Sequence, residues 1–85
     1  MLKIYGSHLC RDCVICKDEL ELAGVEFLYL NISENLLFLK QFLKLREGND
    51  VFDPIREKGQ IGIPCLLRGD GSLTFDWDEF VREKS

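Results

Sequence analysis

The sequence predicts a single α/β domain that spans residues 1–85. Short apolar runs of strand length alternate with segments whose apolar residues recur at helical spacing. No linker, internal repeat or low-complexity segment divides the chain. A chain of 85 residues can bury only one modest core, so these elements are expected to share it.

The first part of the chain has a strand–helix–strand pattern. Residues 2–5 form an apolar run that stops at Gly6 and predicts a buried strand. A helix is expected between Cys10 and Gly24, with one face formed by Cys13, Cys16, Leu20 and Ala23. Residues 25–30 predict a second strand, which a right-handed crossover would pair in parallel with the first.

A long helix is expected next, over residues 36–45. Asn31 with Glu34 resembles a capping box, and Ser33 is an alternative cap. The expected core face consists of Leu36, Leu39, Phe42 and Leu43. The polar stretch 47–59 follows, with a second short helix around residues 54–58.

The last part of the chain predicts a hairpin and a helix. Residues 61–67 read as a strand interrupted by Pro64, whose peptide bond is a candidate for the cis form. Residues 68–71 form a turn, and residues 72–75 the returning antiparallel strand. Asp76 with Glu79 repeats the cap pattern before a final helix that contains Trp77, Phe80 and Val81.

Composition and charge exclude several classes of function. The net charge is -4, and no block of lysine or arginine offers a surface for nucleic acid. No apolar run reaches the length of a membrane span, and residues 1–6 do not resemble a signal peptide. We therefore expect a cytoplasmic protein without membrane or nucleic-acid partners, whose four cysteines serve redox or metal chemistry better than structural disulfides.

Cys10 and Cys13 are the candidate catalytic residues. A cysteine at the start of a helix faces unpaired N–H groups and the positive end of the helix dipole, which stabilise its thiolate. A second cysteine one turn later can bridge to it and resolve a mixed disulfide. The pattern therefore predicts dithiol–disulfide chemistry, with two small core residues as the less favoured explanation.

Three neighbouring residues are candidates for modulating that chemistry. Asp12 suits the first turn of a helix, but its charge also opposes the Cys10 thiolate and makes the couple more reducing. Arg11 or His8 could offset this charge or carry a proton, and His8 is equally well explained as a loop residue.

The order β-α-β-α-β-β-α, with Cys10-x-x-Cys13 after the first strand and Ile63-Pro64 at the third, resembles the glutaredoxin branch of the thioredoxin fold. Within it the chain is most similar to short prokaryotic glutaredoxin-related proteins, through the stretches Gly6-Ser7, 42–46 and 62–66. The resemblance implies a glutaredoxin-type domain over residues 1–85, with a four-stranded mixed sheet and helices on both faces.

The resemblance also implies roles for individual residues. Cys10 would be the nucleophile and Cys13 the resolving thiol, facing a cis-Pro64, while the Ile63 backbone would pair with the substrate. Arg11, Asp76 and Trp77 fall at positions that would contact substrate. Substrates would be protein or small-molecule disulfides, without a tightly bound cofactor.

Glutathione or a thioredoxin-reductase-type donor would supply electrons. The acidic groups at Asp76, Asp78 and Glu79 would oppose a carboxylate such as those of glutathione.

Two other functions remain open from the sequence. Cys10, Cys13, Cys16 and the distant Cys65 have the form of an iron–sulfur or metal ligand set, which would make the protein an electron-transfer module. A redox-sensing binding protein could use the same dithiol as a switch. For Cys16 and Cys65 themselves, packing in the core is the favoured interpretation.

Overall fold

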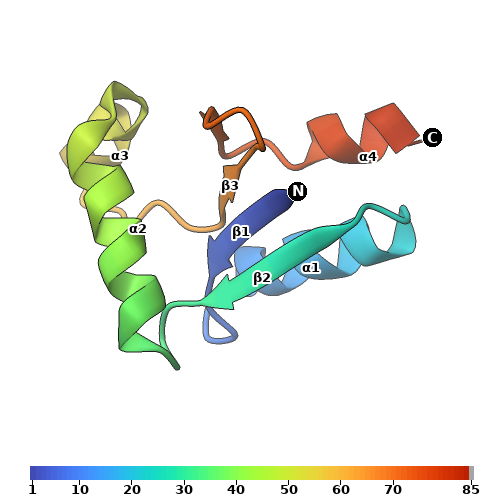
Figure 1. Ribbon diagram of the computed structural model, residues 1–85. Coiled ribbons are helices and arrows are strands. Elements are labelled where there is room, and N and C mark those ends of the chain that lie inside the picture. Colours follow the sequence, from blue (N-terminus) through green and yellow to red (C-terminus); the bar gives the residue numbers. More distant parts are fainter. Residues whose placement is uncertain (85) are drawn as a thin grey trace.

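A computed structural model describes residues 1–84. Its elements, shown in Figure 1, are β1 (Leu2–Gly6), α1 (Arg11–Leu22), β2 (Phe27–Asn31), α2 (Leu36–Gly48), the 3-10 turn η1 (Asp50–Phe52), α3 (Asp53–Glu57), β3 (Cys65–Leu67), β4 (Leu73–Thr74) and α4 (Asp78–Lys84).

The four strands form one mixed sheet in the order β2-β1-β3-β4. β1 pairs in parallel with β2, with Leu2 opposite Phe27. β3 runs antiparallel to β1 on its other side, and β4 returns antiparallel to β3 across the expected turn. The predicted α/β class and the mixed pairing are therefore confirmed.

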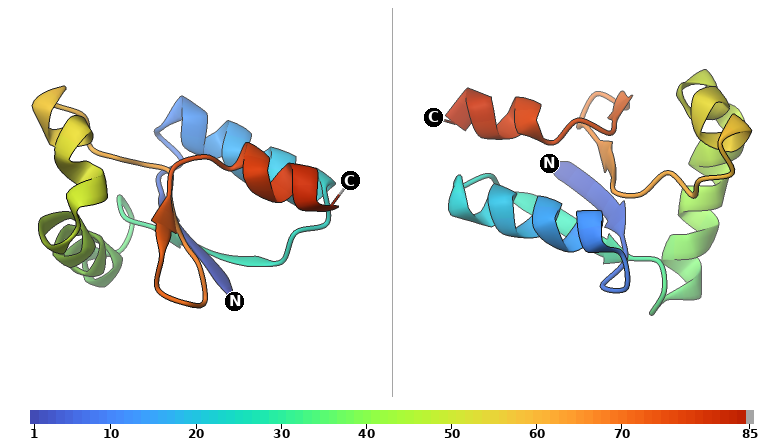
Figure 2. Two further views of the ribbon diagram at one scale, coloured as in Figure 1. Left: turned by 90° about the horizontal axis from the view of Figure 1, so that it is seen from above. Right: turned by 180° about the vertical axis from the view of Figure 1, so that it is seen from behind.

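Helices cover both faces of the sheet. α1 and α4 lie on one face, whereas α2, η1 and α3 lie on the other, as the two views of Figure 2 show. Each face has its own apolar cluster. The α1 and α4 side is built on Leu2, Ile4, Cys16, Leu20 and Leu66. The α2 and α3 side is built on Tyr5, Leu30, Ile32, Phe42, Phe52 and Cys65, and includes the edge-on ring pairs of Phe52 with Phe42 and Phe75.

α2 begins at Leu36 as predicted, but its cap residue and part of its core face differ from the prediction. Asn35 is the N-cap, and its side chain accepts hydrogen bonds from the N–H groups of Leu37 and Phe38. The expected cap residue Asn31 instead ends β2 and accepts a bond from the Ser33 N–H. Leu39 and Phe42 lie on the buried face as predicted, but Phe38 and Leu45 complete this face, whereas Leu36 and Leu43 are exposed.

The third strand and the last helix are shorter than predicted. β3 contains only the residues after Pro64, because a proline without an N–H cannot continue the ladder. Trp77 lies just before α4, whose first-turn residue Asp78 donates its N–H to Asp76. Among residues 1–84, none of the helices combines the length and apolar character needed to cross a bilayer.

Candidate active site

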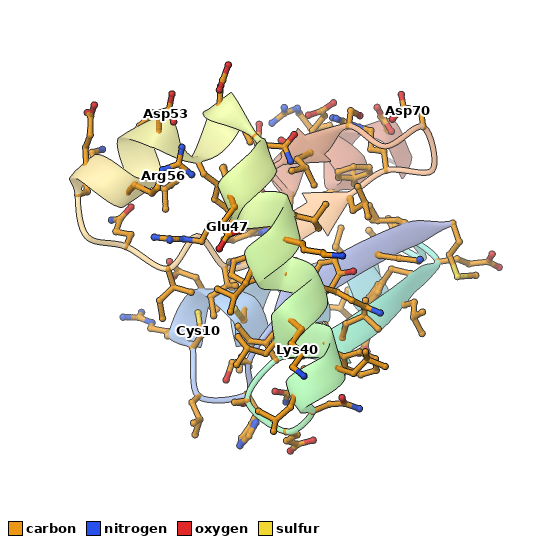
Figure 3. All side chains as sticks on the ribbon, turned by 60° about the vertical axis from the view of Figure 1, so that its left-hand side comes forward. Cys10, Lys40, Glu47, Asp53, Arg56 and Asp70 are labelled. Carbon is orange, nitrogen blue, oxygen red and sulfur yellow. The ribbon has the colours of Figure 1, made fainter. Side chains whose placement is uncertain are left out.

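Cys10 is the N-cap of α1. Its backbone is extended, with φ -102° and ψ 119°, and its N–H donates to the Ser7 carbonyl at 3.1 Å. Its Sγ accepts a hydrogen bond from the Cys13 N–H at 3.3 Å, in the way a serine or aspartate cap would. Cys10 is partly exposed and its sulfur is seen at the start of α1 in Figure 3, whereas Cys13 is fully buried. The pair thus has one accessible and one protected thiol.

The burial of Cys13 controls its protonation. Loss of solvent, together with the neighbouring Cys10 and Cys16 thiols, raises the pKa of this thiol to about 12, while a hydrogen bond with the Ser7 backbone acts in the opposite direction. At neutral pH, Cys13 is therefore held as a neutral thiol.

Cys10 opens into a groove of about 560 Å³. One wall comes from the start of α1 and the other from α3 and the segment that follows it, and Phe75 and Trp77 also line the groove. The groove residues are Leu9, Cys10, Asp12, Ile55, Gly59, Gln60, Ile61, Gly62, Ile63, Pro64, Phe75 and Trp77. The Ile63–Pro64 peptide bond is cis, the form considered from the sequence. Segments distant in the chain therefore meet at one thiol.

The α3 wall is held in place from α2. The Arg46 guanidinium donates to the carbonyls of Gln60 and Ile61 at 3.0 and 3.1 Å. Gly62 has φ +96°, and a Cβ there would lie 2.8 Å from the Phe52 ring. Glycine is thus needed at this position for both backbone conformation and space.

Trp77 is positioned by α1. Its indole N–H donates to the Glu19 carboxylate at 2.8 Å, which ties the segment before α4 to the helix that carries both cysteines. Asp76, predicted to contact substrate, is not among the groove residues and instead accepts the Asp78 N–H at 3.1 Å. Its other oxygen lies 3.7 Å from Arg82.

The remaining predicted residues divide between the groove and its surroundings. Ile63, Pro64 and Asp12 line it with Cys10, as the sequence suggested. His8 turns towards the loop after β2, where its Nδ1 lies 2.9 Å from the Asn31 amide and 3.5 Å from Glu34. Arg11 is exposed at the first position of α1 and is also absent from the groove lining.

The four cysteines are not gathered as a ligand set. Cys16 is buried in the cluster under α1, and Cys65 in the cluster on the opposite face of the sheet. Burial raises the pKa of both thiols to about 12. Within residues 1–84, no group of three or more histidine, cysteine or acidic side chains is placed to hold a metal ion.

Tyr29, which lies near the dithiol, and part of the groove lining were missed in the sequence analysis. Tyr29 on β2 faces α1, and its hydroxyl and the Cys13 sulfur both lie beside Gly6. Side chains alternate between the two faces of a strand, and this alternation along β2 puts Phe27 and Tyr29 on the α1 face. The position of Tyr29 could have been predicted from it. The sequence contains no comparable signal for the contributions of Ile55 and residues 59–62 to the groove, because it does not specify how α3 folds back.

The chain was also compared with known proteins. It is 33% identical over 73 residues to a Haemophilus influenzae protein described as uncharacterized, a match that covers 86% of this chain and 85% of the relative. No protein-family model matches the sequence, and no solved structure matches it.

Proposed function

We propose that this chain, which belongs to the same family as the uncharacterized Haemophilus influenzae protein, has a glutaredoxin-like thiol–disulfide oxidoreductase activity. The observation that carries the proposal is the pairing of a partly exposed helix-capping Cys10 with a buried Cys13, in a groove whose opposite wall contains the cis-Pro64. A nucleophile needs access and a resolving thiol needs proximity, and this pair meets both requirements.

The element order supports a thioredoxin-like fold of the glutaredoxin type as part of the proposal. A parallel β-α-β unit carries the dithiol, and an antiparallel hairpin follows the cis-proline. Helices on both faces of a four-stranded mixed sheet agree with the architecture that the sequence resemblance implies.

The proposed reaction has two exchange steps. The Cys10 thiolate attacks one sulfur of a substrate disulfide, forming a mixed disulfide and releasing the other sulfur as a thiolate. Cys13 then loses its proton and attacks the Cys10 sulfur, so that the second substrate thiol leaves and takes up a proton. The substrate gains two electrons, and the protein is left with a Cys10–Cys13 disulfide that a donor must reduce.

The groove favours an extended peptide as the substrate. Ile63 lies outside β3, so its backbone is not used by the sheet ladder and is accessible to a partner strand. The exposed side chains of Leu9 and Ile61 add apolar surface beside Cys10. No lysine or arginine is among the groove residues, whereas Asp12 is, and this charge disfavours the carboxylates of glutathione. We therefore infer that protein disulfides are better substrates than disulfides that contain glutathione.

The test is reduction of two substrates, a peptide with an internal disulfide and a glutathione mixed disulfide, each with glutathione or thioredoxin reductase as the electron source. Turnover by the wild type that is lost in Cys10→Ser supports the proposal. Cys16→Ser is the matched control, because it removes a buried thiol from the same helix and should retain turnover. Equal activity of the Cys10→Ser variant, or no reduction of either substrate with either donor, would overturn the proposed function.

A further inference from the structure

The arrangement around Gly6 concerns the second step of the proposed reaction. A Cβ built on Gly6 would lie 2.6 Å from the Tyr29 hydroxyl and 3.2 Å from the Cys13 sulfur. The φ of Gly6 is not positive, so the backbone does not demand glycine at this position. Glycine is suited to this position because it has no Cβ. The Tyr29 hydroxyl and the Cys13 sulfur lie next to the space that a Cβ would fill.

We propose that Tyr29 is a positioning residue for the resolving thiol: its hydroxyl donates a hydrogen bond to the Cys13 sulfur as that thiol loses its proton and attacks Cys10. The inference rests on the proposed function and adds a residue to it. A fully buried sulfur that must become anionic has lost the water that would stabilise its charge. The nearby hydroxyl supplies a donor in place of that water.

The electrostatics of Tyr29 agree with a donor role. Burial, followed by the Cys13, Cys10 and Cys16 thiols, raises the pKa of Tyr29, and hydrogen bonding to Cys13 contributes in the same direction. The hydroxyl therefore keeps its proton at neutral pH and acts as a donor, not as a base. The Lys17 ammonium lies over the Tyr29 ring, 5.9 Å from the ring centroid, and is itself paired with Glu21 at 3.0 Å.

Dithiodipyridine, an uncharged aromatic disulfide, separates the two steps in one experiment. The Cys10 thiolate attacks one sulfur of the reagent, a Cys10–pyridyl disulfide forms, and a first thiopyridone leaves. Cys13 then gives its proton to solvent and attacks the Cys10 sulfur, and a second thiopyridone leaves. With one equivalent of reagent, absorbance shows two phases, and the second is the step assigned to Tyr29.

The expected result is that Tyr29→Phe leaves the first phase unchanged and slows the second by about tenfold, the effect of losing one hydrogen bond to a charged group. The matched control is Tyr5→Phe, which removes the other tyrosine hydroxyl on the opposite face, where it donates to Gln41 at 3.3 Å. Gly6→Ala, whose new methyl group displaces the hydroxyl, should slow the second phase in the same way.

A chemical substitution separates hydrogen bonding from packing. The chain contains two tyrosines, so growth on fluorotyrosine in the Tyr5→Phe background labels Tyr29 alone. The more acidic hydroxyl is a stronger donor and should speed the second phase severalfold, which a purely structural role would not do.

The failures of the two proposals look different. A wild-type second phase in Tyr29→Phe, or one that fluorination leaves unchanged, would refute the role of Tyr29 while leaving the dithiol chemistry intact. Absence of a second phase in the wild type would instead refute the resolving role of Cys13, and the inference with it.

Discussion

The three fully buried thiols make a quantitative prediction about stability at alkaline pH. Burial holds the pKa of Cys13, Cys16 and Cys65 at about 12, against an ordinary value of 9.0. Because these pKa values are raised on folding, their contribution to stability is complete below pH 9.0 and is lost as the pH rises towards about 12. Stability is therefore lost at alkaline pH, because the thiols of the unfolded chain release their protons at a lower pH than the buried thiols of the folded protein.

The size of the effect follows from the unfolded chain. Between about pH 8 and about pH 10, a thiol of ordinary pKa goes from mostly protonated to mostly ionised, while the buried thiol stays protonated. Each thiol therefore removes ~1.4 kcal/mol from the free energy of unfolding over this interval. Three thiols together remove ~4 kcal/mol, a large part of the stability of a small domain.

Cys65→Ala isolates one of the three contributions. Cys65 lies outside the dithiol, and burial raises the pKa of its thiol. The free energy of unfolding is measured with urea, under a phosphine reductant, at about pH 8 and at about pH 10. Between these two values it should fall by ~1.4 kcal/mol less in the variant than in the wild type. Val14→Ala, at a half-exposed position on α1, should keep the wild-type loss. An unchanged pH dependence in Cys65→Ala, with unchanged urea slopes, would refute the burial argument.

Three further changes test the groove. Gly62→Ala should lower the free energy of unfolding by about 2 kcal/mol or more, because φ is positive at this position and the new methyl group would contact the Phe52 ring. Gly48→Ala, at the open end of α2, should be neutral or stabilising in the same urea assay. Arg46→Met keeps the apolar stem but removes both bonds to the α3 wall; KM for the peptide disulfide should rise severalfold with little change in kcat, and an unchanged KM would show that the wall needs no anchor. Glu19→Ala removes the acceptor of the indole N–H, so acrylamide should quench the fluorescence of Trp77, the single tryptophan, more strongly than in the wild type; equal quenching would contradict the predicted release of the ring.

Most of the fold could be predicted because its signals are local. The spacing of Cys13, Cys16 and Leu20 predicted the buried face of α1, and the apolar run before Gly6 predicted β1. The hairpin around residues 68–71 followed from turn residues whose conformation depends on their neighbours alone. The cap of α2 was wrong because Asn31, Ser33 and Asn35 are all residue types that cap helices, and the sequence alone does not choose between them.

The candidate site was predictable only where the chemistry is carried by adjacent residues. The positions of Cys10 and Cys13 followed from one motif, and Pro64 marked the opposite wall. The substrate positions Arg11 and Asp76 came from resemblance, and neither side chain lines the groove. Tyr29 was missed because its closeness to Cys13 depends on the parallel register of two strands and on the absence of one methyl group.

The two walls of the groove come from independent parts of the chain. The dithiol wall depends on β1 and α1, whereas the facing wall depends on residues 53–64 and its attachment to Arg46. Substitutions in the second wall can alter the shape presented to a partner without touching either sulfur. In evolutionary terms, the proposed function would let a lineage exchange one target for another while its reaction chemistry is inherited intact.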